Sequence, residues 1–262
     1  MAKITKKPSF DLNGKVAIVT GGTKGIGFAI AETLAMYGCE VAITSRHQND
    51  CDAISQEITK RHGIKCLGIA ADSSKKADID NIIARTVAEF GKIDILCNNA
   101  GVSGKTAPIL KQTEDDYDYV LGINLKGIFL FAQAVAAQMV KQGIGGKIIN
   151  TASVGALIGG KSVAPYGASK AGILSLTKTM ANEWARYGIT VNAICPGYVI
   201  TELNEDIFAD PEIKAKMEKR TALRRLGQPE DVAGPVLAML SDCFGYMTGT
   251  YILLVGGQTI GG

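Results

Sequence analysis

The 262-residue chain lacks the features of several special classes of protein. It has only two histidines, and its six cysteines are scattered without the paired spacing of a zinc site. We therefore expect no bound metal, and a reduced, cytoplasmic protein in which cysteines within apolar runs act as small hydrophobic residues. No unbroken apolar run reaches the roughly 20 residues of a membrane span, and no apolar segment of a secretory signal follows the basic start MAKITKK.

A strong charge of either sign is also missing. The net charge is +3 and basic tracts are short, so we expect neither a nucleic acid nor a membrane as a partner. With 47% hydrophobic and 20% charged residues, the composition is typical of a soluble globular protein. The length suits one large α/β domain, and we find no repeat, linker or shift of composition that divides it.

Short apolar runs alternate with helical patterns along the chain. Such runs predict strands at 15–20, 38–46, 65–71, 93–97, 145–153, 189–197 and 248–257. The alternation predicts an α/β fold with one Rossmann-type, doubly wound parallel sheet of about seven strands and helices on both faces. Residues 202–227 form a long charged interruption. We interpret them as a substrate lid, and a plain exposed helical excursion is the alternative.

The turn after the first strand has the composition of a dinucleotide site. In TGGTKGIG, Gly21 allows a tight turn, Gly25 permits close approach to the backbone, and Gly27 lets the following helix pack on the strand. Backbone N–H groups and the helix N-terminus would then face a pyrophosphate. The other cofactor contacts that we expect from this turn are Thr23, Lys24 and Ile26.

The end of the second strand bears on the choice of cofactor. An acidic residue there would accept hydrogen bonds from the ribose hydroxyls and favour NAD, but this chain has Ser45 followed by Arg46. Arginine pairs well with a 2′-phosphate, and Lys24 adds a second positive charge. We therefore predict NADP(H) in preference to NAD(H). The alternative is that both basic residues are ordinary surface charges.

Polar residues also follow the third and fourth strands, on the ligand side of such a sheet. Asp72, which precedes Ser73, either hydrogen-bonds the adenine or caps the next helix. Asn98 and Asn99 have amides that must be satisfied, either by bracing the sheet or by contacting the cofactor ribose. The further contacts expected at these two strand ends are Ser73, Ala100 and Gly101.

The candidate catalytic residues lie in TASVGALIGGKSVAPYGASK, residues 151–170. Tyr166 and Lys170 are four apart and share one face of a helix. A nearby ammonium favours the phenolate and lowers the tyrosine pKa, which makes Tyr166 a usable general acid or base. Ser153 would donate a hydrogen bond to the same substrate oxygen. Asn124, inside the helical pattern 114–140, is either a structural hydrogen-bonder or a residue that disrupts the helix and holds a water near Lys170.

Together, these pieces resemble the short-chain dehydrogenase/reductase family over essentially the whole chain. They occur in the family's order: TGGTKGIG, Asp72, NNAG, Asn124, Ser153, YGASK and Pro196-Gly197. Within the family, GGKIINTAS, MANEWA and NAICPGY resemble gluconate 5-dehydrogenases and 2-deoxygluconate 3-dehydrogenases, and 3-oxoacyl-carrier-protein reductases share most of these features. The resemblance implies an NADP-dependent enzyme that interconverts a ketone and a secondary alcohol, here on a sugar acid, polyol or related carbonyl compound.

The resemblance also implies roles for a tetrad. Tyr166 would protonate the carbonyl oxygen as hydride reaches the carbon, and Ser153 would hold that oxygen. Lys170 would lower the tyrosine pKa and bind the nicotinamide ribose, and Asn124 would hold a water for proton relay. Contacts to the nicotinamide carboxamide and the phosphates are expected after the sixth strand, from Pro196, Gly197, Val199 and Thr201.

The expected substrate-facing positions are mainly small or apolar and carry no fixed charge. They are Ser103, Ser153, Gly155, Leu157, Tyr166 and Tyr198. A sugar acid requires a cation for its carboxylate, which Lys105 or Lys161 would supply unless both are idle surface lysines. An acyl-carrier protein would instead use the basic residues of the lid. A non-catalytic dinucleotide sensor is a more remote alternative, because such a protein would be expected to have lost Tyr166 or Lys170.

The family is usually tetrameric, with the Tyr166 helix and the last strand at interfaces, and the resemblance implies a homotetramer here. The chain departs from the family at this last strand. Where an aspartate commonly precedes the final glycine pair, Val255 precedes Gly256-Gly257. The departure weakens what the resemblance implies about the C-terminal strand and leaves the tetrad unaffected.

Overall fold

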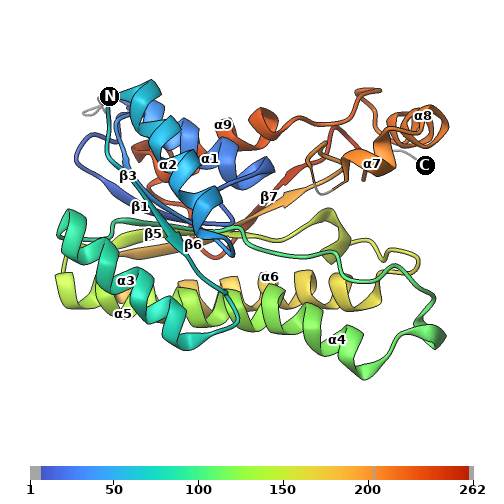
Figure 1. Ribbon diagram of the computed structural model, residues 1–262, viewed down its shortest axis with the longest axis horizontal. Coiled ribbons are helices and arrows are strands. Elements are labelled where there is room, and N and C mark those ends of the chain that lie inside the picture. Colours follow the sequence, from blue (N-terminus) through green and yellow to red (C-terminus); the bar gives the residue numbers. More distant parts are fainter. Residues whose placement is uncertain (1–6, 203, 260–262) are drawn as a thin grey trace, which may run out of the picture.

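A computed structural model describes residues 7–202 and 204–259, which are built around one parallel sheet (Figure 1). The strands are β1 (Val16–Thr20), β2 (Glu40–Ser45), β3 (Cys66–Ala70), β4 (Ile95–Asn98), β5 (Gly146–Thr151), β6 (Ile189–Pro196) and β7 (Tyr251–Leu254). Their order across the sheet is β3-β2-β1-β4-β5-β6-β7, and all neighbours are parallel. The predicted seven-stranded, doubly wound sheet is confirmed.

Helices cover both faces of the sheet, and a separate apolar core fills each side (Figure 1). One core packs Ile30 and Leu34 of the first helix against Val236 of the last. The other contains Ile82 and Phe131. The helices are α1 (Gly25–Met36), α2 (Gln48–His62), α3 (Lys76–Phe90), α4 (Glu114–Leu121), α5 (Ile128–Gln142), α6 (Ala164–Trp184), α7 (Glu205–Phe208), α8 (Pro211–Lys219) and α9 (Pro229–Leu240).

The strand order reverses at β1, which has β2 on one side and β4 on the other. Chain connections leave in opposite directions at such a point, so a crevice forms beyond the carboxyl ends of the two strands. The loops after β1, β4, β5 and β6 meet at this edge. The topology therefore brings together the glycine-rich turn and the Ser153–Lys170 stretch, which are far apart in the sequence.

The helical segment 114–142 changes its winding in the middle. A π-helical stretch, Gly122–Gly127, separates α4 from α5, which confirms the predicted disruption at Asn124. By length and mean hydropathy the segment would suit a membrane span, although it contains no unbroken apolar run of that length. Its buried side chains, such as Phe131 and Met139, pack in the core beside the sheet, and this position accounts for the apolar composition.

Residues 202–227 leave the sheet after β6 and carry the short helices α7 and α8, which lie to one side of the sheet (Figure 1). The two ends of the segment meet. Val199 and Gly227 form an isolated parallel bridge, and Gly227 N donates to Tyr198 O at 2.8 Å. Within the segment, Asp210 caps α8 by accepting from the N–H groups of Glu212 and Ile213.

Candidate active site

A cavity of about 520 Å³ opens at the carboxyl edge of the sheet, where the loops after β1, β4, β5 and β6 meet. Its lining includes most of the predicted site: Gly21, Thr23, Lys24, Gly25, Ile26, Arg46, Ala100, Gly101, Ser103, Ser153, Tyr166, Lys170, Pro196, Gly197, Val199 and Thr201. It also includes Asn99, for which we had left a contact with the cofactor ribose open, and Glu202 and Asn204, which we did not predict as contacts. The predicted contacts that lie off this lining are Gly27, Ser45, Asp72, Ser73, Asn98, Gly155, Leu157 and Tyr198.

The glycine turn forms an open backbone cradle at one end of the cavity. Gly21 and Gly25 adopt φ angles of +65° and +53°, which side chains disfavour. A Cβ on Gly27 would lie 2.1 Å from Gly21 O and 2.5 Å from Asn99 Nδ2, so only glycine permits this packing. Helix α1 begins at Gly25, with its N-terminal N–H groups at the cavity. This arrangement fits a pyrophosphate.

The two basic residues predicted for the cofactor, Lys24 and Arg46, are exposed and lie on the cavity lining. Ser45, which we predicted as a contact, instead donates its hydroxyl hydrogen to His47 O at 3.3 Å. The Ser45 side chain thus stabilises the turn after β2. Of Ser45 and Arg46, only Arg46 lines the cavity.

Asp72 closes a turn. Its Oδ1 accepts from Ser74 N at 2.9 Å and from Ser74 Oγ at 2.7 Å, and these bonds are the main reason that its pKa is lowered. Helix α3 begins later, with Lys75 as its N-cap, so the prediction that Asp72 caps that helix is wrong. Arg46 lies close enough to contribute to the lowered pKa, which places Asp72 near the expected adenosine end of the site.

Asn98 and Asn99, for which we had left open a structural role and a cofactor contact, lie in different surroundings. Asn98 is buried and braces the sheet, because its Nδ2 donates to Ile128 O at 3.0 Å and to Asn150 Oδ1 at 3.3 Å. Asn99 lines the cavity and donates to Thr20 O at 3.2 Å. Successive residues at a strand end point in opposite directions, which explains why one asparagine faces the core and the other faces the site.

Ser153, Tyr166 and Lys170 all line the cavity. Ser153 follows β5, and the other two share one face of α6, as their spacing predicted. Lys170 Nζ lies 5.6 Å from the centre of the Tyr166 ring and donates to Thr151 O at 2.8 Å. Ser153 Oγ accepts from Gly155 N at 3.1 Å, so Gly155 supports the serine from outside the cavity lining.

The electrostatics of this group differ from the prediction. Burial raises the pKa of Tyr166, and a hydrogen bond with Ser153 opposes the rise. Burial also lowers the pKa of Lys170 to about 8. The expected lowering of the tyrosine pKa by Lys170 is therefore wrong for this structure. Loss of water around the phenol is the dominant effect, because desolvation penalises the charged form of either group.

Asn124 lies behind the cavity on the π-helical stretch and is fully buried. Its Oδ1 accepts from Val102 N and its Nδ2 donates to Val102 O, both at 2.8 Å. A Cβ on Gly101 would lie 3.2 Å from Asn124 Oδ1 and 3.5 Å from Lys170 Nζ. Asn124 thus fixes the loop after β4 beside Lys170. Its role in holding a water remains a prediction.

The cations predicted for a substrate carboxylate lie at the surface. Lys105 is exposed and 3.4 Å from Asp116, with which it forms an ion pair. Lys161 is exposed. Arg220 Nη1, at the end of α8, donates to the hydroxyl of Tyr198 at 3.4 Å. Tyr198 therefore connects the loop after β6 with the 202–227 segment.

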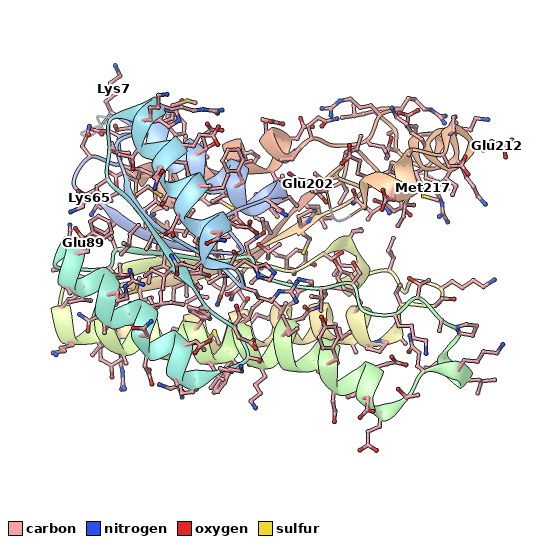
Figure 2. The ribbon with its side chains drawn as sticks, in the orientation of Figure 1. Lys7, Lys65, Glu89, Glu202, Glu212 and Met217 are labelled. Atoms are coloured by element: carbon pink, nitrogen blue, oxygen red, sulfur yellow. The ribbon has the colours of Figure 1, made fainter. Side chains whose placement is uncertain are left out.

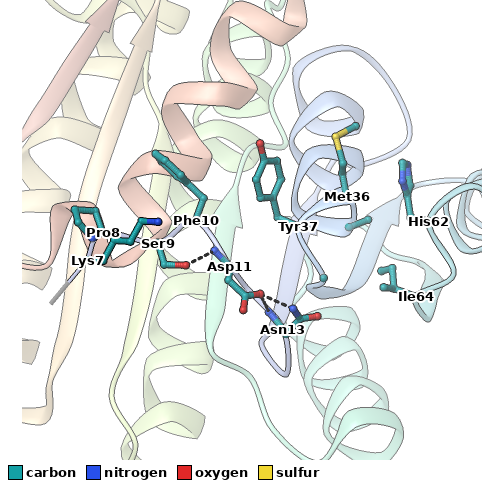
Figure 3. Close-up of a pocket in the computed structure, with 12 residues that line it drawn as sticks. Lys7, Pro8, Ser9, Phe10, Asp11, Asn13, Met36, Tyr37, His62 and Ile64 are labelled. Atoms are coloured by element: carbon teal, nitrogen blue, oxygen red, sulfur yellow. Dashed lines mark hydrogen bonds between the residues drawn. The ribbon is translucent and has the colours of Figure 1, made fainter.

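A second hollow, of about 770 Å³, lies at the opposite edge of the sheet (Figure 3). The segment before β1 and the end of α1 form it, with Phe10 and Tyr37 as its aromatic side chains. Ser9, Asp11 and Asn13 hydrogen-bond to one another along its floor. The hollow contains no predicted site residue, so the carboxyl edge of the sheet is the candidate active site.

A glycine cradle at a helix N-terminus, next to a buried serine, a half-buried tyrosine and a buried lysine, defines a dinucleotide-dependent oxidoreductase. The family model described as "Enoyl-(Acyl carrier protein) reductase" matches residues 21–259. The 2-dehydro-3-deoxy-D-gluconate 5-dehydrogenase of Escherichia coli is 40% identical over 249 residues, which cover 95% of this chain and 97% of the relative.

Two solved structures resemble this chain in both sequence and fold. A short-chain type dehydrogenase/reductase from Mycobacterium marinum is 37% identical with a TM-score of 0.91, and the match covers 96% of this chain and 98% of that one. A gluconate 5-dehydrogenase from Burkholderia cenocepacia, in complex with NADP and tartrate, is 34% identical with a TM-score of 0.91, over 97% and 98%. The chain belongs to the short-chain dehydrogenase/reductase family. It is an oxidoreductase that acts on CH–OH groups with a pyridine-nucleotide cofactor.

Proposed function

We propose that the enzyme interconverts a ketone and a secondary alcohol of a sugar acid or closely related compound, with NADP(H) as its cofactor. The observation that carries this proposal is the convergence of Ser153, Tyr166 and Lys170 beside the glycine cradle in one cavity. When bound, the cofactor supplies or accepts the hydride. The protein's own groups must then hold the substrate oxygen and move one proton.

Tyr166 is the proposed acid–base group, because its phenol is buried beside Lys170 and hydrogen-bonded with Ser153. The phenol is protonated at neutral pH, so it has a proton to give to a carbonyl oxygen, although burial, which raises its pKa, makes it a weaker acid. Ser153 would hold that oxygen. Lys170 would bind the nicotinamide ribose, and Asn124 would hold the water through which the proton is replaced.

The choice of NADP(H) rests on Lys24 and Arg46. Both are cationic and line the cavity near the glycine cradle, and β2 ends in Ser45, which has no carboxylate to receive a ribose hydroxyl. A guanidinium forms charge-assisted hydrogen bonds with a phosphate. Asp72, which we predicted near the adenine, lies close to Arg46 and would help to orient it.

Two observations favour a sugar acid as the substrate. The Escherichia coli relative is a dehydrogenase of a dehydrodeoxygluconate, and the Burkholderia structure contains tartrate, a small hydroxy acid. Two exposed cations, Lys105 and Arg220, have partners that a carboxylate can displace, namely Asp116 and the Tyr198 hydroxyl. Lys105 is two residues from Ser103, and Tyr198 follows Gly197; Ser103 and Gly197 both line the cavity. We infer that one of these two cations receives the substrate carboxylate, and that the 202–227 segment serves as the lid.

We also propose that the enzyme is a cytoplasmic homotetramer. An apolar hollow between α4, α5 and α6 is lined by Leu121, Leu125, Phe129 and Leu176. Phe129 is 39% exposed, which suits a surface covered by a second copy of the chain.

The proposal is tested by following NADPH and NADH oxidation with a panel of keto-sugars, 5-ketogluconate, apolar ketones and 3-oxoacyl thioesters, and with gluconate plus NADP in reverse. We expect turnover of a ketogluconate or a close relative, with NADPH preferred. Turnover limited to acyl thioesters would instead assign a 3-oxoacyl-carrier-protein reductase. Tight NADPH binding with no turnover would indicate a sensor.

A further inference from the structure

The side chain of Asn204 is fully engaged with the loop after β6. Its Nδ2 donates to Val199 O at 2.8 Å, and its Oδ1 accepts from Thr201 N at 2.8 Å. The Asn204 backbone N–H also donates to Thr201 O at 3.0 Å. One residue therefore holds three main-chain groups of the stretch 199–201.

Asparagine has a different local use available at this position. Asn204 is the N-cap residue of α7, where an asparagine side chain normally accepts from the first N–H groups of the helix. Here the side chain forms no hydrogen bond with the described residues of α7. The amide bonds to the loop and not to the helix, which indicates that its role is to stabilise the loop.

The stretch that Asn204 holds forms one wall of the cofactor groove. Val199, Thr201 and Asn204 all line the cavity, and a Cβ on Gly25 would lie 3.1 Å from Thr201 Cβ. The loop therefore faces the glycine cradle directly. Glu202, which follows this loop, is labelled in Figure 2. A shift of this wall changes the width of the groove that a dinucleotide must enter.

We propose that Asn204 is a positioning residue, which sets the backbone of Val199 and Thr201 for the bound dinucleotide and ties that wall to the first helix of the lid. The inference rests on the proposed function in one respect, that the ligand of the cavity is NADP(H). Asn204 does not enter the proton or hydride transfer. Its effect falls on cofactor affinity.

The test is a fluorescence titration with NADPH, which reports binding without any substrate. Each hydrogen bond that Asn204→Ala removes contributes several-fold, so we expect its Kd to rise about tenfold. The matched control is Asp210→Ala. That change removes the cap of α8 in the same lid but touches no group of the 199–201 stretch, so its Kd should stay within about twofold of the wild type.

A second variant separates positioning from a general loss of structure. In Asn204→Asp, the ionised carboxylate accepts from Thr201 N but faces the Val199 carbonyl without a proton to donate. A free aspartate titrates near pH ~4, so this carboxylate stays ionised in a binding assay at about pH 7.5. Titration with NADPH should therefore show Asn204→Asp binding at least as weakly as Asn204→Ala, although the aspartate keeps the size of the asparagine side chain.

Two results would overturn the inference. One is an Asn204→Ala protein that binds NADPH as tightly as the wild type, and the other is equal weakening in Asn204→Ala and Asp210→Ala. An Asn204→Asp protein that binds NADPH as tightly as the wild type would also contradict the role of the hydrogen bond to Val199. A wild-type protein that fails to bind NADPH or NADH would be a different outcome, since it would overturn the proposed function itself.

Discussion

Lys170 Nζ donates to Thr151 O at 2.8 Å and lies 5.6 Å from the centre of the Tyr166 ring. Burial lowers the pKa of the lysine to about 8 and raises the pKa of the tyrosine. Both shifts favour the uncharged forms, because the same interior penalises a positive and a negative charge alike. At neutral pH the tyrosine is uncharged, whereas the lysine carries its charge at an energetic cost, and this cost depends on pH.

We predict that Lys170→Met stabilises the protein at neutral pH and that the gain disappears in alkali. Below pH 8 the lysine is charged in both states, and its burial destabilises the fold. Between pH 8 and its unfolded value of 10.5, only the unfolded state keeps the proton, so the free energy of unfolding of the wild type rises relative to the variant. The shift corresponds to on the order of 3 kcal/mol. Urea unfolding of both proteins from pH 7 to 10 measures it, and parallel curves would show that Lys170 titrates as an exposed lysine does.

Tyr166→Phe should reduce kcat by about 10²–10⁴-fold, because it removes the proposed proton donor and keeps the ring. The NADPH Kd should change little. Tyr187→Phe, at an exposed tyrosine after α6, is the matched control and should retain full activity. Stopped assays of ketone reduction together with NADPH titration separate the two effects. Full reductase activity in Tyr166→Phe would show that another group moves the proton.

Arg46→Asp should raise the KM for NADPH by about 10–100-fold and leave the KM for NADH nearly unchanged, because the charge-assisted contact with the 2′-phosphate is lost. Arg85→Asp, at an exposed position on α3, is the control for net charge. Steady-state kinetics with both cofactors give the ratio. An unchanged preference would mean that Arg46 does not meet the 2′-phosphate.

Gly27→Ala should abolish measurable cofactor binding and destabilise the fold, since its Cβ would lie 2.1 Å from Gly21 O. Gly122→Ala at the end of α4 is the opposite case, because a Cβ there meets nothing within 4 Å and the backbone is already helical. That change should stabilise the protein by about 0.5–1 kcal/mol. Thermal unfolding and NADPH titration of both variants test the pair. Normal binding by Gly27→Ala would show that the cradle tolerates a side chain.

The fold and the centre of the site were predictable from the sequence because both follow local rules. Buried parallel strands appear as apolar runs, and a spacing of four places Tyr166 and Lys170 on one helix face. Which of Asn98 and Asn99 faces the core and which faces the cavity depends on the residue at which β4 ends. If the strand ended one residue earlier or later, the two side chains would exchange their directions. Asp72 closes a turn with Ser74 because helix α3 begins later than the pattern indicated.

Other features required three-dimensional packing. The raised pKa of Tyr166 reflects the packing around its phenol, which no spacing of residues in the sequence expresses. Asn204 gave no signal in the sequence, because an asparagine before a short helix predicts an N-cap. Its contacts with Val199 and Thr201 depend on the path of the loop. The sequence thus predicts which residues the loops deliver to the site, and the packing decides which way each one points.

The bridge between Val199 and Gly227 makes residues 202–227 an insert with a closed base. Since its two ends are bonded to each other and to the sheet edge, the chain between them can be lengthened, shortened or exchanged with only a small change in closure entropy. On the proposal that this segment is the lid, such an exchange alters what covers the entrance and leaves the proposed proton-transfer residues in place. The chain after Asn204 can then diversify toward new alcohols while the cofactor wall at 199–204 stays constant, and a segment transplanted from a relative between 205 and 226 is the natural unit for redesign.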